Sequence, residues 1–217
     1  MPSPPAPLGG LYIILDAEAS CGRSLPDLLL QAADAGARMF QYRNKAASMR
    51  EAYRQAVPLR KAAADAGVRF LINDRCDLAL AVDADGVHLG QQDLPVRLAR
   101  AILGPGKLIG LSTHTEAQVT DATSSGADYL GFGPLFPPGS KRDHDPVVGV
   151  EGLRRVRRLT TLPVFAIGGI TPDRVREIVG AGADGVAVIS AIAQAQDVRA
   201  AVRAVLSQFP SLGPPAR

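Results

Sequence analysis

Three residues that could bind an anion, Gln41, Arg43 and Lys45, stand at alternate positions after the apolar run 37–40. If this segment is a β-strand, its side chains alternate between two faces, so all three point to the same side as Met39. Burying an unpaired cation is costly, so two cations on an inward face predict a bound anion. The alternative is an edge strand whose charges are solvated.

Two carboxylates are predicted to follow neighbouring strands. Asp74 comes directly after Asn73 at the end of an apolar run, and Asp93 follows the next predicted strand in the phrase Gly-Gln-Gln-Asp. Two carboxylates completed by water and a ligand's phosphate oxygens suit Mg²⁺, which is seldom held by protein atoms alone. Each residue could instead cap the helix that follows it. Capping does not explain why both would lie beside Arg43 and Lys45.

A long loop rich in glycine and proline spans residues 131–143 and carries Ser140 and Lys141. Lys141 could reach the same end of the fold as a third cation, and a flexible segment of this kind could close over a substrate. The alternative is a surface loop with incidental charges.

A second kind of anion site is predicted later in the chain. Gly168 and Gly169 follow one predicted strand, and Ile189 and Ser190 follow the last. Glycines let backbone N–H groups approach a phosphate, and a helix beginning at Ser190 would direct its amides at an anion. Tight turns without a ligand are the alternative. Together the two sites suit a pyrophosphate and a single phosphate, which predicts transfer of a group from its diphosphate ester.

The histidines show no metal-ligand spacing. His114, in the phrase Ser112-Thr113-His114, could be a general base, or it could cap or orient the helix that starts near Thr115. His88 lies in a predicted buried strand and is interpreted as a core or lining residue.

These groups need elements that bring them to one place. Short apolar runs recur between longer alanine-rich amphipathic segments, as in parallel βα units. The predicted strands are residues 11–15, 38–42, 70–72, 86–88, 108–111, 129–131, 164–167 and 185–188. The predicted helices are residues 25–35, 49–65, 74–81, 95–103, 116–124, 150–159, 172–179 and 191–206.

The alternation predicts a single-domain (β/α)8 TIM barrel, an α/β fold, with a doubly wound open sheet as the alternative. In such a barrel the active site lies at the carboxyl ends of the strands, where all the polar groups above would meet. Recurring phrases such as Ser125-Gly126-Ala-Asp128 mark turns in which a glycine closes a helix. The barrel is expected over residues 11–208, with a disordered lead-in at 1–10 and a flexible tail at 209–217.

Composition limits the other functions. The chain has 217 residues, 47% of them hydrophobic, and a net charge of +3. No apolar run approaches the roughly 20 residues of a membrane span, and the lead-in does not resemble a signal peptide, so a cytoplasmic protein without a membrane partner is expected. Two cysteines and three scattered histidines do not predict a zinc site. The basic cluster 154–158 is expected to be a solvated helix face, and nucleic acid is not an expected partner.

Several motifs together resemble one family, in order and at its spacing over residues 11–195. They are QYRNK at 41–45, LIND at 71–74, DGVHLGQQD at 85–93, GLSTHT at 110–115, GADYLGFGPLFP at 126–137, SK at 140–141, AIGGIT at 166–171 and GADGVAVISAI at 182–192. The family is that of thiamine-phosphate synthase.

The resemblance implies a (β/α)8 transferase that joins 4-amino-2-methyl-5-pyrimidinylmethyl diphosphate to 4-methyl-5-(2-phosphoethyl)thiazole. Pyrophosphate would leave first, and the thiazole nitrogen would capture the resulting cation. By motif, the pyrimidine diphosphate site would contain Gln41, Arg43, Lys45, Asn73, Ser112, Ser140 and Lys141, with Arg43, Lys45, Ser112 and Lys141 acting in catalysis. Asp74 and Asp93 would bind Mg²⁺, and Gly169, Ile189 and Ser190 would bind the thiazole phosphate.

One segment departs from the family. Its usual Pro-Thr-x-Thr-Lys is Pro137-Pro138-Gly139-Ser140-Lys141 in this chain, so one threonine is lost and Pro138 removes a backbone donor. Two other functions stay open. A related thiazole tautomerase would share the barrel and the thiazole phosphate site but would need no diphosphate site, and a non-catalytic barrel could bind a phosphorylated ligand. A homo-oligomer is possible for any of the three.

Overall fold

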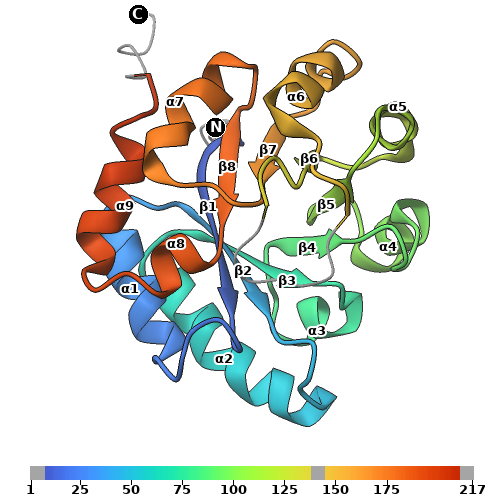
Figure 1. The fold of residues 1–217 in the computed structure, drawn as a ribbon. Helices are drawn as coiled ribbons and strands as arrows, with labels where there is room; N and C mark the ends of the chain where they lie inside the picture. The colour runs from blue at the N-terminus through green and yellow to red at the C-terminus, as the bar shows by residue number, and fades with distance from the viewer. Residues whose placement is uncertain (1–7, 138–144, 211–217) are drawn as a thin grey trace, which may run out of the picture.

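The computed structural model describes residues 8–137 and 145–210. These residues form a closed barrel of eight parallel strands that follow one another in sequence order, with helices around the outside (Figure 1). The last strand pairs with the first, Gly10 with Gly185, so the sheet has no open edge. The predicted TIM barrel is confirmed, and the doubly wound alternative is excluded. Most of the predicted lead-in and tail lies outside the described residues.

The strands lie close to their predicted positions. They are β1 Gly10–Asp16, β2 Met39–Arg43, β3 Arg69–Asn73, β4 Gly86–Leu89, β5 Leu108–Thr113, β6 Tyr129–Phe132, β7 Val164–Ile167 and β8 Gly185–Val188. The helices are α1 Leu25–Asp34, α2 Met49–Asp65, α3 Cys76–Ala81, α4 Val96–Leu103, α5 Glu116–Ser125, α6 Gly149–Arg157, α7 Pro172–Gly180, α8 Ser190–Ala193 and α9 Val198–Leu206.

Two helices differ from the prediction. The helix expected at 74–81 starts at Cys76, because Asp74 has a left-handed φ of 63° and cannot continue a right-handed helix. The helix expected at 191–206 is two helices, because Asp197 starts a new one by accepting a hydrogen bond from the amide of Ala200.

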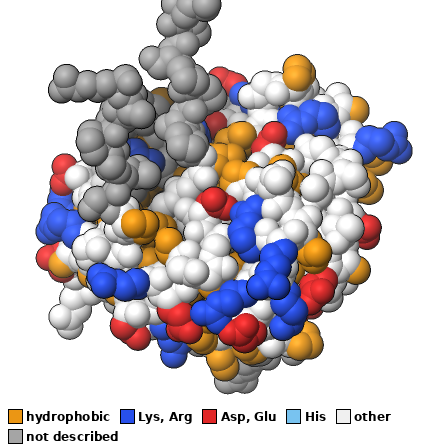
Figure 2. Space-filling model, turned by 90° about the horizontal axis from the view of Figure 1, so that it is seen from above, with side chains coloured by type: hydrophobic (Ala, Val, Ile, Leu, Met, Phe, Trp, Pro, Cys, Tyr) orange, Lys and Arg blue, Asp and Glu red, His pale blue; other side chains and the backbone are white. Residues whose placement is uncertain are grey.

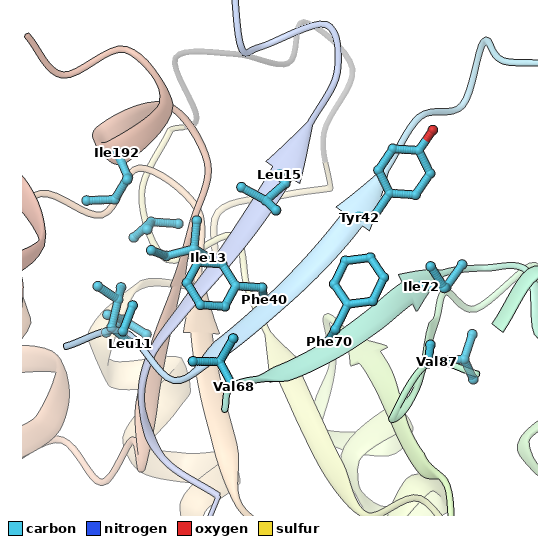
Figure 3. Packing of buried hydrophobic residues seen from close by; sticks show 14 of the residues in the cluster. Leu11, Ile13, Leu15, Phe40, Tyr42, Val68, Phe70, Ile72, Val87 and Ile192 are labelled. Atoms are coloured by element: carbon cyan, nitrogen blue, oxygen red, sulfur yellow. The ribbon is translucent and has the colours of Figure 1, made fainter. Parts of the chain in front are cut away.

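Each strand separates two apolar layers. Residues such as Leu11, Ile13 and Phe40 face outward and pack under the helices, as Figure 3 shows for β1, β2 and β3. Met39 belongs instead to the smaller cluster that fills the barrel, and Gln41 is buried on that side, with 1% of its surface exposed. The predicted alternation is therefore confirmed from Met39 to Tyr42, whereas Lys45 lies beyond the end of β2, with 58% of its side chain exposed.

At the amino-terminal ends of the strands, backbone amides donate hydrogen bonds to partly buried carboxylates. An aspartate precedes each of β4, β6 and β8, and it accepts from a backbone amide of the preceding strand. The pairs are Asp85 with Phe70 at 2.7 Å, Asp128 with Ile109 at 2.7 Å and Asp184 with Val164 at 2.8 Å. An arginine from a neighbouring helix reaches each carboxylate, namely Arg60, Arg100 and Arg157. The aspartate in the recurring Gly-Ala-Asp phrase therefore has a structural role.

Charges of both signs share the surface. Figure 2, which looks down on the molecule from above the view of Figure 1, shows Lys and Arg side chains lying beside Asp and Glu. Within the basic cluster 154–158, Arg154 pairs with Glu151 and Arg155 with Glu116. Among the described residues, no helix has the length and apolar character that crossing a membrane requires.

Candidate active site

The carboxyl end of β2 places Gln41 inside the barrel and Arg43 at its rim. Arg43 forms an ion pair with Asp16, its register partner on β1. Asp16 is 5% exposed, and its Oδ1 accepts hydrogen bonds at 3.0 Å from the amides of Glu18 and Ala19. A buried carboxylate therefore holds the guanidinium that the sequence predicts as an anion-binding group. Sequence reasoning gave Asp16 no role, although its position at the end of β1 was a signal.

Lys45 and the two predicted metal ligands form a second charged group. Lys45 Nζ lies 3.2 Å from Asp74 Oδ2. Burial is the largest influence on Asp74 and raises the pKa of its carboxyl, the neighbouring Asp93 raises this pKa further, and Lys45 opposes both. Asp93 Oδ2 accepts a hydrogen bond from the amide of Gly90 at 2.7 Å. The barrel therefore brings two carboxylates and a cation together, as the sequence predicts.

The capping alternative for these aspartates is wrong. The N-cap positions of α3 and α4 belong to Arg75 and Pro95. Two adjacent carboxylates without a capping role repel each other, and a divalent cation would relieve that repulsion. Among the described residues, no group of three or more His, Cys, Asp or Glu side chains could enclose a metal. The oxygens that Asp74 and Asp93 offer are of the kind that a hard cation such as Mg²⁺ accepts, with water and a ligand supplying the others.

A chain of hydrogen bonds crosses the barrel interior between two predicted substrate-binding residues, Gln41 and Ser112. Gln41 Nε2 donates to the Tyr12 hydroxyl at 2.5 Å, which lies 3.0 Å from the Tyr129 hydroxyl. His88 Nδ1 lies 3.0 Å from that second hydroxyl, and His88 Nε2 lies 2.9 Å from Ser112 Oγ. Burial lowers the pKa of His88 to about 4.

His88 is therefore a lining residue, as predicted, and it is neutral at physiological pH. Tyr12 and Tyr129 were missed by sequence reasoning. Each lies in an apolar strand. The alternation of side chains along the strand, which points both tyrosines into the barrel, was the only signal of their position.

His114 contacts the loop after β6. Its Nδ1 lies 2.6 Å from the carbonyl oxygen of Gly133, and its Nε2 lies 3.4 Å from Asp145 Oδ2. Its backbone amide donates to Gln118 Oε1 on α5, whereas Thr115 is the N-cap of that helix. These contacts support the orienting role over the capping role.

The loops after β6 and β7 are paired side by side. The amide of Leu135 donates to the carbonyl of Ile167 at 2.8 Å, and the amide of Phe136 donates to the carbonyl of Gly168 at 3.1 Å. Backbone hydrogen bonds thus join the two segments beyond the end of β6. The loop that carries the predicted lysine leaves from the segment that forms one wall of the predicted phosphate site.

Gly169 lies in a crowded position. Its φ is 60°, and a Cβ built on it would lie 2.7 Å from the carbonyl oxygen of Pro137. Arg174 Nη1 donates to the carbonyl of Gly169 at 2.6 Å, and its guanidinium carbon lies 4.2 Å from the ring centroid of Phe136. The last predicted residues, Ile189 and Ser190, are the N-cap and first residue of α8, after the strand next to β7.

The remaining predicted residues are Asn73, Ser140 and Lys141. Asn73 ends β3, where its register partner is His88. Ser140 and Lys141 lie outside the described residues, so their predicted roles stay predictions.

Known proteins resemble this chain over nearly its whole length. The sequence model of the family described as "Thiamine monophosphate synthase" matches residues 11–192. The thiamine-phosphate synthase of Chloroflexus aurantiacus is 47% identical over 193 residues, which cover 89% of this chain and 89% of that protein. The thiamine-phosphate synthase of Moorella thermoacetica is 44% identical over 197 residues, which cover 91% of this chain and 94% of that protein.

A solved structure agrees with these sequence matches. The thiamine phosphate pyrophosphorylase of Pyrococcus furiosus superimposes with a TM-score of 0.82 at 39% identity, covering 92% of this chain and 94% of that one.

Proposed function

Since this chain belongs to the thiamine-phosphate synthase family of transferases, we propose that it joins a pyrimidinylmethyl diphosphate to a thiazole phosphate, releasing pyrophosphate. The observation that carries the proposal is the meeting of Lys45, Asp74 and Asp93 beyond the carboxyl ends of β2, β3 and β4. Arg43, held by Asp16, ends β2 two residues before Lys45. Two cations beside two metal-ready carboxylates suit a diphosphate better than a single phosphate.

The reaction separates charge, and residues of this protein can stabilise the negative charge that develops on the leaving pyrophosphate. The bond between the pyrimidinylmethyl carbon and the diphosphate oxygen breaks, and both electrons go to the leaving pyrophosphate. Arg43 and Lys45 would bind those oxygens, and the ion pair with Asp16 would hold the guanidinium in position. Asp74 and Asp93 would hold Mg²⁺, which neutralises pyrophosphate charge when bound.

The second substrate would be held by the other predicted site. Gly169, Ile189 and Ser190 would bind its phosphate, and the thiazole nitrogen would donate an electron pair to the pyrimidinylmethyl carbon. The thiazole nitrogen attacks through its lone pair and carries no proton that must be removed, so the step needs no general base. His114 then has a structural role, consistent with its contacts to Gly133 and Asp145. The predicted roles of Ser140 and Lys141 at the diphosphate complete the proposal.

The test is a product assay with purified protein, both substrates and Mg²⁺. We expect thiamine phosphate and pyrophosphate to form in equal amounts, and neither to form when the thiazole phosphate is left out. Isomerisation of a thiazole phosphate without release of pyrophosphate would contradict the proposal and would identify a tautomerase. Tight binding of both phosphorylated compounds without any product would identify a binding protein.

A further inference from the structure

The hydrogen-bonded chain through the barrel interior has a direction that its donors and acceptors determine. It consists of Gln41, Tyr12, Tyr129, His88 and Ser112, and both tyrosines are buried, with 1% and 0% of their surfaces exposed. At such depth an unpaired hydroxyl proton is costly, by about 1–3 kcal/mol. The favoured arrangement is the one in which every proton has an acceptor.

Gln41 sets the first step, because the amide nitrogen that faces Tyr12 can only donate. The Tyr12 oxygen accepts that bond, and its own single proton points to Tyr129. The Tyr129 oxygen therefore accepts, and its proton points to His88 Nδ1. In the reverse direction, the Tyr12 oxygen would accept from both neighbours and its proton would have neither of them as an acceptor.

The same counting assigns the histidine. A proton on Nδ1 would have to be donated to Tyr129, which is the reverse direction, so Nδ1 is an acceptor and the imidazole is neutral. Its proton is then on Nε2, which donates to Ser112 Oγ at 2.9 Å. The Ser112 oxygen accepts from His88. Its hydroxyl proton can therefore be donated to a group that is not one of these five residues.

We propose that Tyr129 and His88 are positioning residues that present Ser112 as a hydrogen-bond donor to the pyrimidine diphosphate. This rests on the proposed function for the identity of the ligand, though not for the direction of the chain. The ligand atom that meets Ser112 must be an acceptor. Neither Tyr129 nor His88 needs to touch the substrate for this effect.

The direct test is the tautomer of His88 in the ligand-free protein. In protein labelled with ¹⁵N-histidine, two-bond ¹⁵N–¹H correlation spectra distinguish a proton on Nε2 from one on Nδ1. The His88 signals can be assigned by elimination with His114→Asn and His144→Asn. We expect the Nε2–H tautomer at neutral pH. The Nδ1–H tautomer would overturn the proposal, because Ser112 would then be donating to the histidine.

Tyr129→Phe tests whether the hydroxyl of Tyr129 determines the tautomer of His88. The variant removes the donor to His88 Nδ1, so the imidazole is free to take the Nδ1–H form and to accept from Ser112. We expect the tautomer to change and the KM for the pyrimidine diphosphate to rise about tenfold, the effect of losing about one hydrogen bond, with the KM for the thiazole phosphate unchanged. An unchanged tautomer in this variant would contradict the relay.

Tyr42→Phe is the matched control. It removes a tyrosine hydroxyl that donates to Gln55 at 2.8 Å on the outer side of the same barrel wall. Both the tautomer and the two KM values should stay at their wild-type levels. If the wild-type protein shows the Nε2–H tautomer but forms no thiamine phosphate, the proposed function fails and the assignment of the chain stands.

Discussion

Asp16 holds Arg43 at the rim of the barrel, where we propose that the guanidinium binds an anion. A guanidinium has five N–H donors in a planar fork, and the contact with Asp16 is made through Nη1. Fixing one branch of the fork lowers the entropy that is lost when the other branch binds a phosphate. The amides of Glu18 and Ala19 hold Asp16 in turn, so this carboxylate and its guanidinium partner are positioned without a ligand.

Arg43→Lys should therefore not be neutral, although it keeps the charge. An ammonium cannot bind Asp16 and a phosphate through one planar fork. We expect kcat/KM for the pyrimidine diphosphate to fall roughly tenfold to a hundredfold, since a hydrogen bond to a charged group contributes about 1.5–3 kcal/mol. Steady-state kinetics would measure this, with Arg54→Lys on the exposed face of α2 as the control. Equal loss in both variants would contradict the role of the fork.

Asp74 should make the ligand-free protein less stable than an amide would at that position. Burial and Asp93 raise the pKa of the Asp74 carboxyl, so the wild type loses stability as the pH rises from the ordinary aspartate pKa through the raised one. Asp74→Asn should raise the free energy of unfolding at neutral pH, and the gain should vanish near about pH 3, where aspartates are protonated in both states.

Urea unfolding at both pH values would measure this difference. Asp65→Asn is the control, because Asp65 is an exposed partner of Lys61 on α2 and should show no such gain. An Asp74→Asn protein that is less stable than the wild type at neutral pH would show that the carboxylate stabilises the empty site.

Much of the site could be predicted from the types of single residues and from the alternation and order of the strands that carry them. The inward position of Gln41 followed from strand alternation, and the meeting of Asp74 with Asp93 followed from the order of β3 and β4. The pairing of Asp16 with Arg43 could not be predicted, because it depends on the register between strands. The same holds for the tyrosines of the buried chain.

At the scale of elements, the paired loops after β6 and β7 shape the predicted thiazole phosphate site. Arg174, from α7, joins them by donating to the Gly169 carbonyl and lying over the Phe136 ring. A cation–π contact and a charge-assisted hydrogen bond thus hold one backbone segment from two sides. The glycine phrase was predicted from sequence, but this support was not, since Arg174 and Phe136 are 38 positions apart in the chain.

Gly169→Ala should disrupt this site. The left-handed φ of 60° costs a non-glycine residue roughly 1–2 kcal/mol, and the added Cβ would lie 2.8 Å from the Cβ of Phe136. We expect the KM for the thiazole phosphate to rise at least about tenfold while the KM for the pyrimidine diphosphate changes little. Gly180→Ala, at a position with no heavy atom within 4 Å of the new Cβ, is the control. A wild-type KM for the thiazole phosphate in Gly169→Ala would argue against the assignment.

Elements were predicted best where turn residues bounded an apolar run, and least well where one residue decided a boundary. The strands were found because runs such as that of β7 are short, apolar and bounded by turn residues. The end of α8 depends on the turn before Asp197, and the start of α3 depends on the φ of Asp74. Neither feature changes the hydrophobic pattern.

At the scale of the molecule, the two ends of the barrel have different tasks. The amino-terminal end is fixed by the aspartate–amide bonds before β4, β6 and β8, and the carboxyl end carries the candidate site. Closure of β8 on β1 is what brings residues far apart in sequence to one rim. The groups that stabilise the fold are thereby separated from those that we propose bind ligands.

The central claim is that three successive strands of this barrel build one diphosphate site that includes a metal ion. Calorimetric titration of pyrophosphate into the wild-type protein, with and without Mg²⁺, tests it without relying on turnover. We expect binding of one pyrophosphate per chain that depends on Mg²⁺ and weakens at least about tenfold in Lys45→Met and in Asp93→Asn. Binding that is equally strong without Mg²⁺ and in both variants would contradict the account.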